Sequence, residues 1–211
     1  MIWIFLFYIV AGFFSGSILY SALLPRLFSK VDIVEDSDDH NPGTANVFKL
    51  VGPVMGLICL LLDMAKGFFP VFLALTSLDF HRFPFALVMA APVLGHAFSP
   101  FARFHGGKAI ATSFGVLLSL CLYSNMVWYL AGVFIFFSIG VTIRPHSCRV
   151  IASFLCFLLS CVFVVPIRSF AVGGVIVSAI VLAKHLFPRE FTLSQVQISL
   201  FGRRKFPKHA N

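Results

Sequence analysis

The sequence predicts an all-α fold, a polytopic integral membrane bundle of about seven transmembrane helices. Of its 211 residues, 59% are hydrophobic and only 11% are charged, and the mean hydropathy is +0.97. A soluble domain carries roughly 25% charged residues, so this chain lacks the charge to cover a wet surface. Its apolar residues form long runs, and in lipid such runs become helices because a helix pairs its own backbone groups.

Seven apolar runs are candidate spans, since a hydrocarbon core of about 30 Å needs roughly 20 apolar residues. The runs lack the alternation of barrel strands, and no inverted repeat of the transporter kind is present. We expect a seven-helix transmembrane domain over residues 1–187 and a basic cytoplasmic tail over 188–211. The spans cover about residues 2–24, 50–77, 84–101, 111–124, 126–142, 150–166 and 170–187.

The basic residues predict the orientation of the bundle. If the N-terminus is outside, twelve Lys and Arg residues fall in the inner segments and only Arg82 and Arg168 in the outer ones. Positive residues favour the cytoplasmic side, so we expect the N-terminus outside and the C-terminus in the cytoplasm. The net charge of +8 then reflects topology and anionic-lipid contacts, and nucleic acid binding is not expected.

The five cysteines predict no metal site and no disulfide framework. They lie in or beside apolar runs without the spacing of metal ligands, at positions 59, 121, 148, 156 and 161. Small buried hydrophobes are the simplest interpretation of such cysteines.

A glycine pair followed by lysine lies in the loop before the fourth apolar run. Exposed N–H groups of paired glycines, a helix N-terminus and a lysine together favour phosphate. This is not a Walker P-loop, because the first glycine of that motif and its preceding strand are missing. The alternative interpretation is an interfacial loop with topogenic charges. The candidates in this loop are Arg103, His105, Gly106, Gly107, Lys108 and Thr112.

The longest inner loop ends in a segment of turn formers and amides, Asn41 to Asn46. Turn residues shape the backbone there, and the amides present donors. The alternative interpretation is a simple capping turn, with Asn46 as the N-cap of the second span.

Four ionisable residues lie in or near apolar runs: Asp63, Lys66, His96 and His185. Charges at membrane depth are costly and usually face a bundle interior or a polar cavity. Asp63 and Lys66 are three residues apart, so they share a helix face and can pair. The predicted topology brings most of these groups and both loops to the cytoplasmic face, which suits an amphiphilic phosphorylated substrate.

Taken together, these segments resemble the bacterial membrane glycerol-3-phosphate acyltransferases that use acyl-phosphate as donor, the PlsY type. The resemblance covers about residues 10–165. Its most specific stretches are residues 41–49, 63–67, 95–96 and 103–112.

This resemblance implies a seven-helix bundle in the bacterial cell membrane, with the active face in the cytoplasm. It implies transfer of an acyl group from acyl-phosphate to the sn-1 hydroxyl of glycerol 3-phosphate, which gives lysophosphatidic acid. Membrane lipids are the other expected partners, and neither a metal nor an organic cofactor is expected. The candidate substrate-binding residues are Asn41, Gly43, Asn46, Lys49, Lys66, His96 and the six residues of the glycine-containing loop.

The chain departs from the family pattern at the groups nearest the chemistry. Asp39 and His40 stand where the family has Ser-Gly, and His105 replaces a lysine. Lys49 replaces a common arginine. The last motif keeps His185 but lacks its asparagine.

A histidine is the natural base near neutral pH. We therefore expect the catalytic base to be His185 or His40, the latter paired with Asp39.

Two other classes of function remain open from the sequence. The altered motifs allow a catalytically altered or inactive paralogue that binds lipid or a protein partner. A small transporter would explain the intramembrane charges, although the missing repeat disfavours it.

Overall fold

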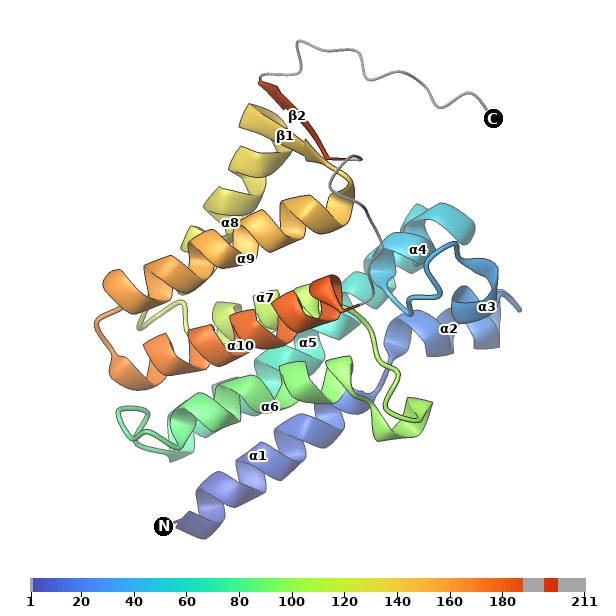
Figure 1. Ribbon diagram of the computed structural model, residues 1–211. Helices are drawn as coiled ribbons and strands as arrows, with labels where there is room; N and C mark the ends of the chain where they lie inside the picture. Colours follow the sequence, from blue (N-terminus) through green and yellow to red (C-terminus); the bar gives the residue numbers. More distant parts are fainter. Residues whose placement is uncertain (1, 188–195, 201–211) are drawn as a thin grey trace.

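The computed structural model describes residues 2–187 and 196–200 as a bundle of packed helices, with shorter helices gathered at one end (Figure 1). The helices of the bundle body are α1 (Ile2–Ser17), α5 (Pro53–Ser77), α6 (Phe85–Ala97), α7 (Ile110–Ser119), α8 (Met126–Ile135), α9 (His146–Phe163) and α10 (Arg168–Leu186). The end of the bundle carries α2 (Tyr20–Phe28), α3 (Ile33–Asp36), α4 (Thr44–Leu50) and the 3₁₀ helix η1 (Pro100–Ala102).

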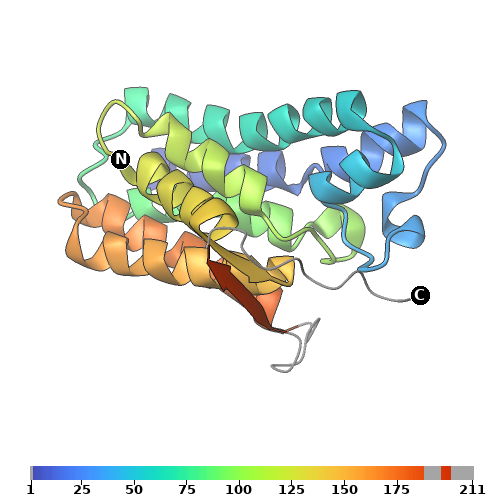
Figure 2. The same cartoon turned by 90° about the horizontal axis from the view of Figure 1, so that it is seen from above.

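Glycines allow the long helices to pack closely. α1 packs on α6, α5 on α7, and α10 on both α6 and α9, and Figure 2 shows these helices side by side. A Cβ at Gly95 would overlap the Phe13 carbonyl, and one at Gly115 would overlap the Met64 carbonyl. Small residues at such crossings let backbones approach where lipid provides no hydrophobic drive between helices.

The expected first span, 2–24, is not one helix. α1 and α2 are bent by 40° at Ile18 and Leu19. The two carbonyls freed at the bend have partners from other helices: Ser99 Oγ donates to Ser17 O at 2.7 Å, and Lys66 Nζ donates to Ile18 O at 2.6 Å. Inserted side chains are a recognised cause of helix breaks, and here they satisfy the exposed backbone groups.

Within the described residues, four segments are long and apolar enough to cross a membrane: Pro53–Ser77, Phe85–Ala102, His146–Phe163 and Arg168–Leu186. The bent pair α1–α2 makes a fifth if it counts as one span. α7 has ten residues, so it is about 15 Å long, half of a hydrocarbon core. The predicted number of seven spans therefore stays a prediction.

Several predicted boundaries are wrong. The helix expected over 111–124 ends at Ser119. The helix expected over 126–142 ends earlier, in a π-helix, η2 (Phe136–Gly140), and strand β1 (Val141–Arg144) follows. β1 pairs antiparallel with β2 (Gln197–Leu200), so residues 2–187 and 196–200 are all-helical apart from this small sheet and the loops. Most of the predicted tail lies outside the described residues. Asn46 is not an N-cap, because α4 begins at Thr44 after Gly43.

Replacing Gly115 by alanine tests the close crossing of α5 and α7. We expect Gly115→Ala to lower the free energy of unfolding by about 1–3 kcal/mol, the usual cost of overpacking, since its Cβ would meet backbone rather than a flexible side chain. Gly132→Ala is the matched control, because a Cβ there meets nothing within 4 Å. Thermal unfolding in detergent measures both variants; equal stabilities would contradict the packing argument.

Candidate active site

A small cavity of about 90 Å³ lies between the two loops that the sequence analysis singled out. Its walls come from the loop before α4 and the turn into α7, and Asp63, His96 and His146 complete it from α5, α6 and α9. The lining residues are Asp39, Asn41, Gly43, Thr44, Ala45, Asn46, Asp63, His96, Lys108, Ala109, Ile110, Ala111 and His146. The structure thus brings six of the predicted site residues to one place, Asp39, Asn41, Gly43, Asn46, His96 and Lys108, together with the ionisable Asp63.

An ion pair joins the two loops across this cavity. Lys108 Nζ lies 2.9 Å from Asp39 Oδ2, and Asn46 Nδ2 donates to Asp39 Oδ1 at 2.7 Å. Burial raises the pKa of Asp39, but the hydrogen bonds of Lys108 and Asn46, the charge of Lys108 and the Asn41 N–H together leave that pKa below its ordinary value. Asp39 is therefore a carboxylate that holds Lys108 and shapes the loop.

The glycine pair does not present its N–H groups to a ligand. Gly106 N donates to Ala97 O at 3.2 Å, and Gly107 N donates to His96 O at 3.1 Å. A Cβ at Gly106 would overlap the His96 carbonyl, and one at Gly107 would overlap the His96 ring. The prediction of an anion site made by glycine N–H groups is thus wrong: the glycines dock the loop onto the end of α6, and that docking places Lys108.

A buried group of charges lies beneath the cavity. Lys66 pairs with Asp63 at 2.7 Å and lies 2.7 Å from His96 Nδ1, while Ser21 Oγ donates to Asp63 Oδ2 at 2.6 Å. The pairing of Asp63 and Lys66 expected from their spacing is confirmed. Lys66 is not among the cavity-lining residues, so its predicted substrate contact has no geometric support here.

The two candidate bases differ in their surroundings. His185 is fully buried, and its Nδ1 lies 2.8 Å from Val181 O. His40 Nδ1 lies 2.8 Å from Val34 O, and the side chain is exposed outside both cavities described here. The predicted pairing of His40 with Asp39 is wrong, because Asp39 instead binds Lys108 and Asn46.

A basic wall that the sequence analysis missed comes from α9 and α10. His146 lines the cavity, its Nδ1 lies 2.8 Å from Arg149 Nη2, and it interacts electrostatically with His185, Lys108 and Lys49. Lys184 Nζ donates to Gly106 O at 3.0 Å. The signal in the sequence for this wall is the cluster of basic residues at the start of the sixth apolar run, which by itself indicates only a topology determinant.

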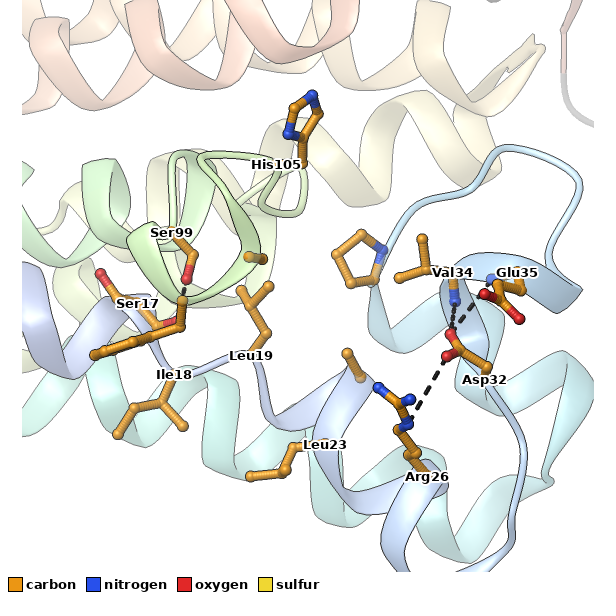
Figure 3. Close-up of a pocket in the computed structure, with 14 residues that line it drawn as sticks. Ser17, Ile18, Leu19, Leu23, Arg26, Asp32, Val34, Glu35, Ser99 and His105 are labelled. Atoms are coloured by element: carbon orange, nitrogen blue, oxygen red, sulfur yellow. Dashed lines mark hydrogen bonds and ion pairs between the residues drawn. The ribbon is translucent and has the colours of Figure 1, made fainter.

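A larger cavity, of about 550 Å³, lies on the other side of the same loops. Figure 3 shows Ile18, Leu19 and Leu23 along one wall, and Arg26, Asp32 and Glu35 along the opposite one. Pro42 and His105 also line it. His105 therefore belongs to this cavity and not to the small one, contrary to the expectation that it flanks a phosphate site.

The remaining predicted residues lie around the small cavity rather than in its lining. Arg103 is exposed and adopts a left-handed backbone conformation with φ 52°. Lys49 is exposed in the last turn of α4. Thr112 is fully buried, and its carbonyl faces Gly67 of α5.

Comparison with known proteins finds one family. The family model described as glycerol-3-phosphate acyltransferase matches residues 6–188. A glycerol-3-phosphate acyltransferase of Thermotoga petrophila is 40% identical over 57% of this chain and 61% of its own length. One from Pseudothermotoga lettingae is 42% identical over 54% of this chain and 57% of its own length. The chain thus matches about three fifths of the length of these curated relatives.

The fold is also found in a solved structure. The crystal structure of PlsY (YgiH), an integral membrane glycerol 3-phosphate acyltransferase in its glycerol 3-phosphate form, superposes with a TM-score of 0.75. It is 24% identical, and the match covers 88% of this chain and 90% of that chain. The match of the family model to residues 6–188 decides the assignment: this chain belongs to the glycerol-3-phosphate acyltransferase family.

Proposed function

We propose that this protein is an acyltransferase that uses acyl-phosphate and glycerol 3-phosphate to make lysophosphatidic acid. A bond forms between the acceptor hydroxyl oxygen and the acyl carbon, and the bond from that carbon to the phosphate oxygen breaks. Inorganic phosphate leaves with the electron pair, and the hydroxyl proton passes to a base. Because the donor is already activated, the protein need only orient the reactants, take the proton and stabilise the developing charge.

The observation that carries this proposal is the lysine in the lining of the small cavity, with further cations beside it. Lys108 and His146 line it, with Arg149 and Lys49 nearby, and the first residues of α7 form part of its wall. Lysine, arginine and the N-terminus of a ten-residue helix all favour phosphate. This wall is the proposed site for the phosphate of glycerol 3-phosphate.

The larger cavity is the proposed site of the donor's acyl chain. Its volume of about 550 Å³ is within the range of ligand pockets, and one wall is apolar (Figure 3). The segments that contain Pro42 and His105 line it, while their neighbours Asn41 and Lys108 line the small cavity. An acyl-phosphate lying across these segments would place its chain in one cavity and its reactive carbon near the other.

His185 is the better candidate for the base by its tautomer, although it is fully buried and lines neither cavity. A carbonyl oxygen can only accept a hydrogen bond, so the 2.8 Å contact of Nδ1 with Val181 O puts the proton on Nδ1. The lone pair is then on Nε2, which is the form that a general base needs. His185 also interacts with His146, which lines the cavity.

We also propose seven membrane spans in the bacterial cell membrane, with the N-terminus outside and the site at the cytoplasmic face. The strong bias of basic residues toward one set of loops supports this orientation. The short helix α7 would span only part of the bilayer by itself. Packed on α5, it can lie within the bundle, where lipid does not surround it.

A direct assay with acyl-phosphate and labelled glycerol 3-phosphate tests the proposed reaction. We expect the purified protein to form lysophosphatidic acid. We expect Lys108→Met to lose about 10- to 150-fold in kcat/KM, because the bound phosphate would lose a charge-assisted partner worth about 1.5–3 kcal/mol. Arg82→Met, in the loop at the other end of α6, is the control with unchanged activity. Absence of product from the wild-type protein would instead favour an inactive paralogue.

The ion pair of Asp39 predicts a specific change in KM. Because this carboxylate competes with substrate phosphate for Lys108, we expect Asp39→Asn to lower KM for glycerol 3-phosphate about two- to fivefold, the range of a partly exposed ion pair. The lowered pKa of Asp39 keeps the pair intact above the ordinary pKa of aspartate, and the pair is lost only as the pH falls through that lowered pKa. The change in KM should therefore be constant from pH 5.5 to 8.5. A 100-fold fall in kcat of Asp39→Asn would contradict this and would show that Asp39 takes part in catalysis.

Alanine variants of the two histidines identify the base. We expect His185→Ala to lower kcat by about 10²- to 10⁴-fold, the usual contribution of general base catalysis, and His40→Ala to leave kcat within about threefold. Steady-state kinetics at saturating substrates measures both. Full activity of His185→Ala would exclude it as the base, and unchanged activity in both variants would remove histidine from this role.

A further inference from the structure

Lys66 is surrounded by three acceptor atoms from three parts of the bundle. Its Nζ lies 2.7 Å from Asp63 Oδ1, 2.6 Å from Ile18 O and 2.7 Å from His96 Nδ1. The side chain is only 2% exposed. An ammonium group carries three protons and no lone pair, so this set of three acceptors matches it, and the adjacent carboxylate favours the charged form.

The contact with Lys66 determines which nitrogen of His96 carries the proton. Because an ammonium can only donate, Nδ1 of His96 must accept, and the imidazole proton is then on Nε2. This is the opposite tautomer from that of His185. Donation from a cation also polarises the ring, which makes its remaining N–H a stronger hydrogen-bond donor.

The Nε2 atom of His96 has no hydrogen-bond partner in the part of the chain that the structure describes. The residue is only 3% exposed, yet it lines the small cavity. Nε2 lies against Gly107, so close that a Cβ at this position would overlap it. Nε2 is not among the fully buried atoms that lack a hydrogen-bond partner, and its ring lines the small cavity, so an N–H at this atom borders the cavity in which the substrates are proposed to react.

We propose that Lys66 fixes His96 as an Nε2–H donor, and that this N–H binds the carbonyl oxygen of the acyl group as negative charge develops on it. The second half rests on the proposed acyltransfer. As the acceptor oxygen bonds to the acyl carbon, the carbonyl electron pair moves onto oxygen, and it returns when phosphate leaves. A preorganised neutral donor in a desolvated site suits this transient charge.

The charges around the cavity favour the carbonyl over the phosphate as the partner of His96. The phosphate has cationic partners in Lys108, which lines the cavity, and in Arg149, which contacts the lining residue His146, and these bind anions more strongly than a neutral imidazole does. At His96 the carboxylate of Asp63, 4.0 Å from Nδ1, is paired with the nearer ammonium of Lys66, so this residue offers a neutral donor and not a cation. Lys66 is accordingly a positioning residue, and His96 is the residue that contacts substrate.

Nitrogen NMR of the full chain in lipid nanodiscs, with ¹⁵N-labelled histidine, tests the tautomer without any substrate. We expect His96 to show a protonated Nε2 and an unprotonated Nδ1, with the signals assigned by their absence in His96→Gln. In the double variant Asp63→Asn with Lys66→Met, which avoids leaving one buried charge unpaired, we expect a mixture of tautomers. A proton on Nδ1 in the wild-type protein would overturn the assignment.

Kinetics of His96 variants test whether the Nε2–H group of His96 stabilises the carbonyl oxygen during the reaction. We expect His96→Leu to lower kcat by about 10²- to 10³-fold, the usual cost of removing one such donor, with KM for glycerol 3-phosphate within about threefold. His96→Gln, which keeps a donor at the same reach, should recover at least tenfold of this loss. His81→Gln, in an exposed loop, is the matched control with wild-type kinetics.

The outcomes separate this inference from the proposed reaction. A rise in KM at unchanged kcat in His96→Leu would mean that His96 binds a ground-state phosphate, and it would overturn the oxyanion role. Equal activity of the Leu and Gln variants would also overturn the oxyanion role, provided that thermal unfolding shows both variants to be folded. Lack of any acyltransfer by the wild-type protein would refute the proposed function, whereas the NMR result would still decide the tautomer.

Discussion

The buried ammonium of Lys66 is the interaction on which the rest of the site depends. Its three acceptors belong to α5, to α6 and to the bend between α1 and α2. Removing a charge from water is expensive unless it is paired and hydrogen-bonded, so these contacts fix the three segments in one arrangement. The bend exists because Lys66 and Ser99 satisfy the carbonyls that a continuous helix would have paired internally.

The bend and the glycine loop together produce the two cavities. Ile18 and Leu19, exposed by the bend, form a wall of the larger cavity. Gly106 and Gly107 pack on the end of α6, and this packing brings Lys108 to Asp39 across the smaller one. The glycines are therefore required for close approach of backbones, and the cationic side chains, not the glycine N–H groups, are the proposed ligands for anions.

The sequence was sufficient to predict the helical membrane bundle, the ion pair of Asp63 with Lys66 and the convergence of both loops, because these follow from local patterns. It was not sufficient to predict the bend, which directly follows Gly16 and Ser17 but whose donors lie 48 and 82 residues away. The contribution of His146 depends on how α9 packs at the cavity. The pairing of Asp39 with Lys108 spans 69 residues and displaced the expected local partner, His40.

Two buried histidines in this site are given opposite roles by the atom that faces Nδ1. In His185 that atom is a backbone carbonyl oxygen. It accepts a hydrogen bond from Nδ1–H, so the lone pair is on Nε2. In His96 it is the ammonium of Lys66, which donates and leaves the proton on Nε2. Acyl transfer from an activated donor requires one group that takes a proton and another that stabilises an oxyanion. In the proposed mechanism the same side chain meets both requirements, because the surrounding helices determine its tautomer at each position.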